Sequence, residues 1–324
     1  MSTAPLLRPG PVVCIGETMA ALAPDPVAPL DTAELLRLDV AGAESNVAMY
    51  LADHGVPAHW VSALGDDPFG RRVRERIAAS GVDVSGVRTD PARPTGLLVK
   101  NPGADSTGVH YYRTGSAASA LGPPALDDPA VRDAALVHLT GITPALSASC
   151  RALVDRALRP ERPYAVSFDV NHRPALWRDE PAAEVLLPLA ARADLVLVGL
   201  DEAQALWGPD LASADAVRAL LPQPRVLVVK DGARAATAYV GPDTYTVPAP
   251  KVRVVEPVGA GDAFAGGFLA GLLRHDDPVR ALRLGHLTAA SALRVPADHG
   301  PLPPPDRVRE LLSADDSAWN DLSI

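Results

Sequence analysis

The fold is decided by four short apolar runs, Leu136–Leu139 (LVHL), Ala165–Phe168 (AVSF), Leu195–Val198 (LVLV) and Val226–Val229 (VLVV). A stretch of helical character separates each run from the next. Short strands that are apolar throughout are typical of a parallel sheet, because helices cover both faces of such a sheet. We therefore predict an α/β fold, with a doubly wound, mostly parallel sheet flanked by helices.

The N-terminal part of the chain follows the same alternation. Val12–Ile15 is typical of a short strand, 44–54 of a helix and 61–64 of a second strand. A further helix begins at Asp67-Pro68, a residue pair that favours a helix start, and ends before Gly81. Together with the four runs, this predicts a single domain over residues 1–313, followed by a polar, frayed tail over 314–324.

Two segments, about 17–41 and 95–113, do not follow this alternation. The first has no clear helix before Glu34, and the second contains two strand-like stretches around the turn Asn101-Pro102-Gly103-Ala104-Asp105. We expect these segments to form a small antiparallel sheet that projects from the main domain as a lid. The alternative is an ordinary surface hairpin.

The composition excludes two kinds of partner. The 324-residue chain has a formal net charge of −9, which argues against nucleic acid and anionic membrane surfaces. No stretch approaches the roughly 18 uncharged apolar residues that span a bilayer, and residues 1–11 lack the apolar region of a signal peptide. Cys14 and Cys150 lie in apolar contexts, as buried thiols of a reducing compartment do. We expect a cytoplasmic protein.

A second informative stretch is Pro257-Val258-Gly259-Ala260-Gly261-Asp262-Ala263-Phe264, followed by a helix-like apolar run. Small residues let the backbone approach a ligand, and the first N–H groups of a helix lack intrahelical acceptors. With the positive end of the helix dipole, these groups suit a phosphate. Asp262 would lie in the first helical turn, where it can take a proton from an attacking hydroxyl. The alternative is that Asp262 only caps the helix.

Four motifs, in order along the chain, resemble the ribokinase-like, or PfkB, family of sugar kinases. Gly42–Ala48 (GAESNVA) with Leu64–Gly70 (LGDDPFG) is similar to the family's N-terminal signature, and Val258–Asp262 (VGAGD) to its C-terminal signature. Lys230–Ala236 (KDGARAA) resembles its nucleotide loop, and Glu202 its Asn-x-x-Glu motif. The resemblance spans nearly the whole chain. It implies an ATP-dependent kinase whose lid keeps water away from ATP.

The resemblance also implies roles for individual residues. Asp262 would be the base, and the backbone N–H groups of Gly259, Ala260 and Gly261 would form an anion hole. Mg²⁺ would be held mainly through water, with Glu202 acting at a distance. The nucleotide would be bound by Asn171, Lys230, Gly232, Ala233, Ala235 and His286. For Lys230, the alternative is a residue that merely ends its strand.

Four positions depart from the family's pattern. Gly199 stands at the Asn of Asn-x-x-Glu, and Glu256 stands where an aspartate usually starts the C-terminal motif. His286 stands where the family often has an asparagine by the adenine. Related enzymes often have a second aromatic hydroxyl near the position of Leu98, and a leucine cannot donate a hydrogen bond there.

Within the family, Tyr111–Ser119 (YYRTGSAAS) and Asp169–Trp177 (DVNHRPALW) most resemble the 2-keto-3-deoxygluconate kinases. Guanidinium groups bind planar carboxylates through paired hydrogen bonds, whereas ribose and fructose carry no carboxylate. The resemblance implies that the sugar acid is bound by Gly42, Tyr111, Tyr112, Arg113 and Arg173. The alternatives are that Arg113 is a solvated strand residue and that Arg173 pairs with Asp169.

The expected reaction transfers the γ-phosphoryl group of ATP to the primary hydroxyl of 2-keto-3-deoxygluconate. One alternative is a PfkB kinase for ribose, fructose or another deoxy sugar acid, and a more distant one is a non-catalytic sensor of sugars or nucleotides. A dinucleotide dehydrogenase is disfavoured, since Gly16-Glu17-Thr18-Met19 lacks the required glycine turn. A homo-oligomer formed through the lid edge is possible by analogy with relatives, the alternative being an edge that is covered internally.

Overall fold

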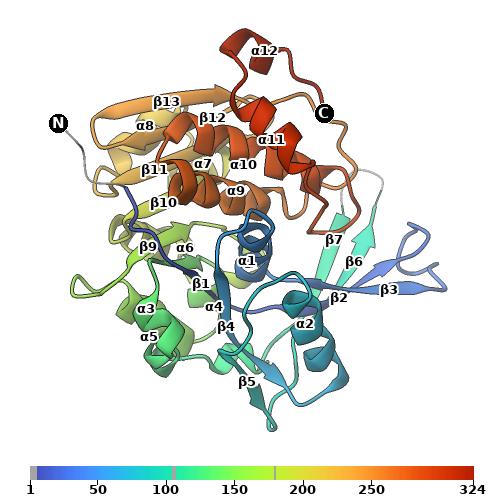
Figure 1. Cartoon of the computed structure of the whole chain (residues 1–324). Helices are drawn as coiled ribbons and strands as arrows, with labels where there is room; N and C mark the ends of the chain where they lie inside the picture. Colours follow the sequence, from blue (N-terminus) through green and yellow to red (C-terminus); the bar gives the residue numbers. More distant parts are fainter. Residues whose placement is uncertain (1–5, 104–106, 179) are drawn as a thin grey trace.

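A computed structural model describes residues 6–103, 107–178 and 180–324. These residues form an α/β unit from which a small sheet projects on one side (Figure 1). None of the helices in these ranges combines the length and the apolar character that crossing a bilayer would require.

The main sheet contains nine strands within the described ranges, in the order β13-β12-β11-β10-β9-β8-β1-β4-β5. All neighbours from β11 to β5 pair in parallel, and β12 and β13 add an antiparallel hairpin at one edge. The predicted mostly parallel sheet is therefore confirmed. The strands are β1 (Val12–Ile15), β4 (Ala58–Gly65), β5 (Val87–Asp90), β8 (Leu136–Thr140), β9 (Ala165–Asp169), β10 (Leu195–Gly199), β11 (Val226–Asp231), β12 (Ala235–Val240) and β13 (Asp243–Pro248).

Both faces of this sheet are buried, because successive side chains of a strand point to opposite sides. In β10, Leu195 and Leu197 pack into one apolar cluster, and Val196 and Val198 pack into another. The first face is covered by α1 (Ala43–Asp53), α2 (Pro68–Ala78), α9 (Ala260–His275), α10 (Pro278–Leu293) and α11 (Pro305–Leu312). The second face is covered by α3 (Pro129–Asp133), α4 (Thr143–Leu146), α5 (Ala148–Ala157), α6 (Ala182–Ala191), α7 (Leu200–Trp207) and α8 (Ala214–Leu220).

Helix α2 begins where the sequence predicts. Asp67 caps it by accepting a hydrogen bond from the Gly70 backbone N–H at 2.7 Å, and Pro68 occupies the first turn. The other carboxylate oxygen of Asp67 accepts the Thr95 N–H at 2.8 Å. One side chain thus starts a helix of the main unit and also fixes the start of the second projecting segment.

Helices α9 and α10 pack against each other at very short range. A Cβ atom at Gly271 of α9 would lie 2.5 Å from the Ala281 Cα of α10, so only glycine fits at this crossing. The close contact fixes α9, whose first turn carries Asp262, against the core.

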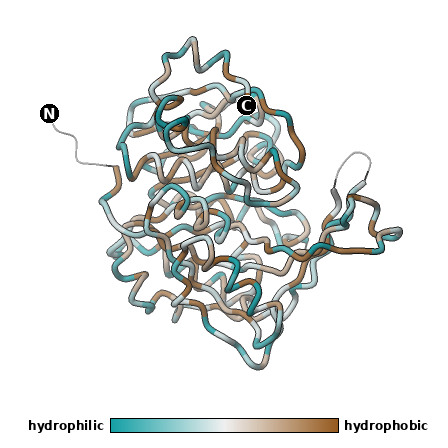
Figure 2. Tube along the Cα trace, turned by 45° about the vertical axis from the view of Figure 1, so that its right-hand side comes forward, coloured by the Kyte–Doolittle hydropathy of each residue, from teal (hydrophilic) through white to brown (hydrophobic). Residues whose placement is uncertain are grey.

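The projecting sheet consists of β2 (Met19–Pro24), β3 (Leu36–Ala41), β6 (Leu97–Pro102) and β7 (Thr107–Tyr112), in the order β3-β2-β6-β7 (Figure 1). Figure 2 shows these segments standing out from the side of the main unit. The pairs β2–β3 and β6–β7 are antiparallel hairpins, but β2 and β6 pair in parallel. The expectation of an entirely antiparallel sheet is therefore wrong. Two hairpins that both leave the main unit have first strands that run in the same direction. The predicted turn residues Ala104 and Asp105 lie outside the described residues.

The expected frayed tail is instead packed against the main unit. Trp319, in α12 (Asp316–Asn320), is only 2% exposed, and its indole N–H donates to the Pro248 carbonyl oxygen at 2.9 Å. The guanidinium of Arg283 lies 5.0 Å from the Trp319 ring centroid and pairs with Asp316. A large aromatic side chain can anchor a polar segment that carries little other apolar surface.

We expect Trp319→Ala to lower the free energy of unfolding by about 3 kcal/mol, the typical cost of deleting a buried aromatic side chain. Urea unfolding followed by circular dichroism measures this loss. The control is Ser317→Ala, an exposed position of the same helix. Equal stability of the two variants would mean that the tail does not pack on the core in solution.

Candidate active site

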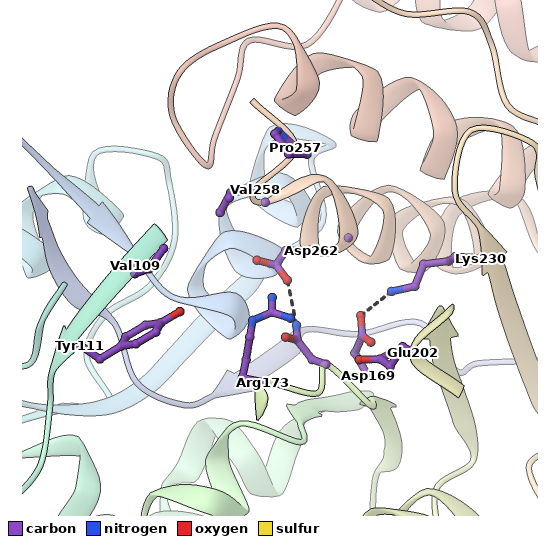
Figure 3. A pocket seen from close by; sticks show the side chains of 12 residues that line it. Val109, Tyr111, Asp169, Arg173, Glu202, Lys230, Pro257, Val258 and Asp262 are labelled. Atoms are coloured by element: carbon purple, nitrogen blue, oxygen red, sulfur yellow. Dashed lines mark hydrogen bonds and ion pairs between the residues drawn. The ribbon is translucent and has the colours of Figure 1, made fainter. Parts of the chain in front are cut away.

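A cavity of about 440 Å³ lies at the carboxyl ends of the central strands, where α/β folds commonly bind ligands (Figure 3). The ends of β9, β10 and β11, or the loops that follow them, provide one wall. The N-terminus of α9 provides a second wall, and β7 of the projecting sheet provides a third. The lining residues are Val109, Tyr111, Asp169, Asn171, Arg173, Glu202, Lys230, Pro257, Val258, Gly259, Gly261 and Asp262.

Asp262 lies at the centre of this cavity and is held by two amide side chains. Asn46 of α1 donates from Nδ2 to one carboxylate oxygen at 3.0 Å, and Asn171 donates from Nδ2 to the other at 3.1 Å. Asn171 adopts a φ of 39°, a left-handed conformation that is uncommon outside glycine. The carboxylate is thus fixed in orientation by segments far apart in the sequence.

Burial raises the pKa of Asp262 to about 7. The hydrogen bond from Asn46 and the positive charge of Arg173 lower this pKa, while the negative charges of Asp169 and Asp298 raise it. A carboxylate with a pKa near neutrality is a better proton acceptor than an ordinary aspartate, so the site is suited to general base chemistry.

Gly259 shapes the turn into α9. Its φ is 85°, and a Cβ atom there would lie 2.6 Å from the Asp298 carbonyl oxygen. Both observations require glycine at this position. The turn brings Gly259, Ala260 and Gly261 together at the start of α9, where the first N–H groups of a helix lack intrahelical acceptors and suit an anion. The Ala260 N–H makes a long hydrogen bond of 3.4 Å to the Pro257 carbonyl oxygen.

A buried charge network lies beside this helix N-terminus. Lys230 Nζ donates to Asp169 Oδ2 at 3.0 Å. A Cβ atom at Gly261 would lie 3.7 Å from the same ammonium, so Lys230 reaches the start of α9. Burial lowers the pKa of Lys230, but the charges of Asp169 and Glu202 raise it more, so the net pKa is raised and the ammonium stays charged.

Glu202 joins the loops that follow β9 and β10. One of its carboxylate oxygens accepts the His172 N–H, and the other accepts the Gly199 N–H at 3.1 Å. The carboxylate thus orders the start of α7, although Gly199 offers no side chain. Burial raises the pKa of Glu202, and the nearby Asp169 charge raises it further. Glu256 accepts the Val258 N–H at 3.3 Å and so supports the turn before α9.

The donors here fit a magnesium ion that is held mainly by phosphate and water. Asp169 Oδ1 is buried and has no hydrogen-bond partner among the described residues. Within the same ranges, no cluster of three His, Cys, Asp or Glu side chains forms a protein metal cage. Mg²⁺ at phosphoryl-transfer sites usually takes one or two carboxylates and keeps several waters, and Asp169 and Glu202 match that pattern.

Opposite the helix N-terminus, two predicted substrate residues reach the cavity. Tyr111 projects from β7, and the exposed guanidinium of Arg173 lies next to Asp262 (Figure 3). Arg173 makes no ion pair with a carboxylate in the described part of the chain. Asp169, its expected alternative partner, pairs with Lys230 instead.

Two other predicted substrate residues do not line the cavity. Arg113 is 9% exposed and forms an ion pair with Glu17, which also accepts a hydrogen bond from the Ser116 hydroxyl. This cluster lies where both segments of the projecting sheet join the main unit. Arg113 is therefore neither solvated nor open to the cavity here. Tyr112 is 66% exposed, because alternate residues of β7 point away from the cavity.

The remaining predicted residues surround the site without lining the cavity. Gly42 caps α1, the helix that carries Asn46. Gly232 and Ala233 lie in the β11–β12 turn, where Gly232 has a φ of 52°, and Ala235 is the first residue of β12. His286 is buried in α10, with its Nε2 atom 3.0 Å from the Val247 carbonyl oxygen. Burial lowers the pKa of His286 to about 4, so its ring is neutral.

The sequence analysis gave no binding or catalytic role to two residues that lie at the centre of the site, Asn46 and Asp169. Asn46 lies inside a quoted motif, and its position one helical turn after Gly42 is the signal that it faces the same site. Asp169 directly follows the apolar run of β9. A carboxylate at the carboxyl end of a parallel strand is a recognisable signal for a ligand site.

Comparison with known proteins identifies the family of the chain. Residues 11–304 match the family described as pfkB family carbohydrate kinase. The 2-dehydro-3-deoxygluconokinase of Thermoproteus tenax is 37% identical over 94% of each chain. The 2-dehydro-3-deoxygalactonokinase of Haloferax volcanii is 33% identical over 94% of this chain and 98% of its own. Fructokinase-1 of Oryza sativa is 34% identical over 70% of this chain and 72% of its own.

Solved structures show the same architecture. A PfkB protein from Polaromonas sp. superposes with a TM-score of 0.81 at 33% identity, covering 95% of this chain and 100% of its own. A ribokinase II from E. coli, solved with ATP and Mg²⁺, has a TM-score of 0.80 at 23% identity, covering 89% and 94% of the two chains. The match over residues 11–304 and the shared architecture lead to one conclusion: the chain belongs to the pfkB family of carbohydrate kinases.

Proposed function

We propose that this kinase transfers the γ-phosphoryl group of ATP to the primary hydroxyl of 2-keto-3-deoxygluconate, also named 2-dehydro-3-deoxygluconate. The observation that carries the proposal is that Asp262 and Arg173 line the same cavity. The first is a buried carboxylate at a helix N-terminus, and the second is a guanidinium without a carboxylate partner in the described ranges. Together they offer a base for the hydroxyl and a cation for the acid group of a sugar acid.

The reaction needs positioning and charge stabilisation more than covalent chemistry. Asp262 accepts the proton of the primary hydroxyl as the bond from its oxygen to the γ-phosphorus forms. The bond between that phosphorus and the ADP oxygen breaks, and ADP leaves with the electron pair. The N–H groups of Gly259, Ala260 and Gly261 donate to the charge on the transferred group, a contribution of about 3–4 kcal/mol per donor in other enzymes.

ATP would lie along the carboxyl ends of β10 and β11. Lys230 would contact a phosphate, and the exposed turn containing Gly232 and Ala233 would contact the nucleoside. Asp169 and Glu202 would hold Mg²⁺ through water, and the ion would neutralise charge on the phosphates. Asn171 keeps Asp262 oriented and lines the same cavity.

The choice of a sugar acid rests on Arg173 and Tyr111. A guanidinium that makes no ion pair with any described carboxylate, and that lines a cavity, favours a ligand with a carboxylate, because paired hydrogen bonds to that group are strong. The similarity to the Thermoproteus kinase supports the gluconate-derived acid. The similarity to the Haloferax kinase makes the galactonate-derived epimer the second candidate.

The deciding experiment measures ADP release from wild-type protein and Arg173→Met with Mg²⁺ and ATP. The substrates are 2-keto-3-deoxygluconate, its galactonate epimer, ribose and fructose. We expect turnover on a keto acid, and we expect Arg173→Met to raise its KM by about 10-fold to 100-fold through loss of a charge-assisted hydrogen bond. Turnover on a neutral sugar with an unchanged KM in the variant would make Arg173 a structural residue and the substrate neutral.

For Asp262→Asn we expect kcat to fall by about 10²-fold to 10⁴-fold, the usual contribution of a general base. The amide has nearly the same shape, so the protein should remain folded and its ATP affinity should stay close to wild type. Asp276→Asn is the matched control, since Asp276 is exposed at the opposite end of α9. A fully active Asp262→Asn protein would exclude Asp262 as the base.

The acid limb of kcat/KM should follow the ionisation of Asp262. Burial raises its pKa to about 7, so kcat/KM should fall about tenfold per pH unit below that value as the carboxylate becomes protonated. Asn46→Ala removes a hydrogen bond that lowers this pKa, and should move the limb to higher pH. A limb near the ordinary aspartate pKa in wild-type protein would contradict the assignment.

A further inference from the structure

The loop formed by residues 294–300 connects the projecting sheet to the candidate active site. It is held to the sheet at two places. Lys100 Nζ of β6 lies 2.9 Å from Asp298 Oδ1, and Arg37 of β3 donates from Nη2 to the Pro296 carbonyl oxygen at 2.8 Å. Each side chain of the Lys100–Asp298 pair is less than 10% exposed. The contact is therefore a buried one between segments 198 residues apart.

The same loop lies directly against the turn that begins α9. A Cβ atom at Gly259 would lie 2.6 Å from the Asp298 carbonyl oxygen and 2.9 Å from its Cα, so the two backbones touch. Beyond Asp298, the Gly300 N–H donates to the Tyr50 hydroxyl at 2.8 Å, and His299 lies 2.8 Å from Asp53. Tyr50 and Asp53 belong to α1, the helix that holds Asp262 through Asn46.

Lys100 also belongs to the face of the sheet that meets the cavity. Its partner in the β6–β7 register is Val109, which lines the cavity, and Leu98 is paired with Tyr111 in the same way. Directly paired residues of antiparallel strands point to the same face. The Lys100 side chain therefore projects from this face, next to the cavity, and its ammonium contacts Asp298.

A buried ion pair of this kind is weak evidence for stability. Removing two charges from water is costly, and an apolar pair of similar volume often stabilises a protein as well or better. Breaking one partner, by contrast, leaves a buried charge without compensation. The geometry of the Lys100–Asp298 pair therefore points to a role in placing the elements that it joins.

We propose that Lys100 is a positioning residue for phosphoryl transfer. Through its ion pair with Asp298, Lys100 fixes the turn at Gly259 relative to the projecting sheet. The inference rests on the proposed function, since the turn matters as the anion hole beside Asp262. When the projecting sheet lies over the cavity, this loop transmits the position of the sheet to the turn that begins α9. Lys100 acts through Asp298 and not by contact with the transferred group.

The pair also adjusts the charge around Asp262. The amides of Asn46 and Asn171 donate to this carboxylate, and the charged groups that act on it include Arg173, Asp169, Asp298 and the ammonium of Lys230. The charge of Asp298 raises the pKa of Asp262, and Lys100 compensates that charge at 2.9 Å. Loss of Lys100 should therefore move the acid limb of kcat/KM to higher pH, while loss of the Asp298 charge should move it to lower pH. Simple structural damage does not produce opposite shifts.

The test compares Lys100→Met, Asp298→Asn, the double variant and the conservative Lys100→Arg in the full chain. Lys251→Met is the matched control, because Lys251 is exposed and outside the site. We expect each single variant to lower kcat about tenfold, as small misplacements of reacting groups do, with KM for ATP little changed. The double variant should lose no more kcat than either single variant does. Lys100→Arg should retain most of the activity.

A second readout does not depend on activity. Hydrogen–deuterium exchange should be faster in Lys100→Met than in wild type for peptides covering 257–262 and 294–300, and unchanged in Lys251→Met. Normal kcat, an unshifted acid limb and unchanged exchange in Lys100→Met would overturn the positioning role. A wild-type protein that is inactive on every sugar would overturn the proposed function instead, while faster exchange would still support the coupling of lid and turn.

Discussion

The two hydrogen bonds that Asp262 accepts are the interaction on which the site depends. They come from Asn46 and Asn171, which lie 216 and 91 residues away in the sequence. One donor belongs to α1 and the other follows β9, so the carboxylate can be held only when both elements are in place. The parallel sheet makes this possible, because it directs the ends of its strands to the same edge. The orientation of the catalytic carboxylate therefore requires the same arrangement of α1 and β9 that the fold requires.

The main architecture follows from local sequence patterns. The apolar runs that begin at Leu195 and Val226 are short and uninterrupted, and each forms a strand buried on both faces. Asp67 and Pro68 start a helix because a capping oxygen and a fixed φ act within one turn. Gly259 and Asp262 were recognisable for the same reason, since their geometry depends on neighbouring residues in the chain. Sequence patterns predict these features because each depends on residues that are neighbours in the chain.

Other features depend on contacts between distant segments, which local patterns do not contain. Arg113 pairs with Glu17 at the base of the lid, although a guanidinium after a strand fits a substrate clamp equally well. The parallel pairing of β2 with β6 follows from where two hairpins leave the sheet. Trp319 anchors a tail that is otherwise polar, and its receiving surface on β13 and α10 is formed only in the folded chain. His286 likewise contacts the carbonyl oxygen of Val247, a residue distant in the sequence, which no local pattern around His286 predicts.

The burial of Asp262 also has a thermodynamic consequence. An unfolded chain ionises this carboxyl at its ordinary pKa, whereas burial raises the folded pKa to about 7. Between these two values the folded state binds a proton that the unfolded state has lost, so the contribution of this group to stability decreases as the pH rises. Above pH 7 the carboxylate is ionised in both states, and its charge is less favourable in the folded one. The ionised protein, which is the form that can accept a proton, is therefore less stable than the protonated one would be. The hydrogen bond from Asn46 reduces the free-energy cost of the buried charge without removing it.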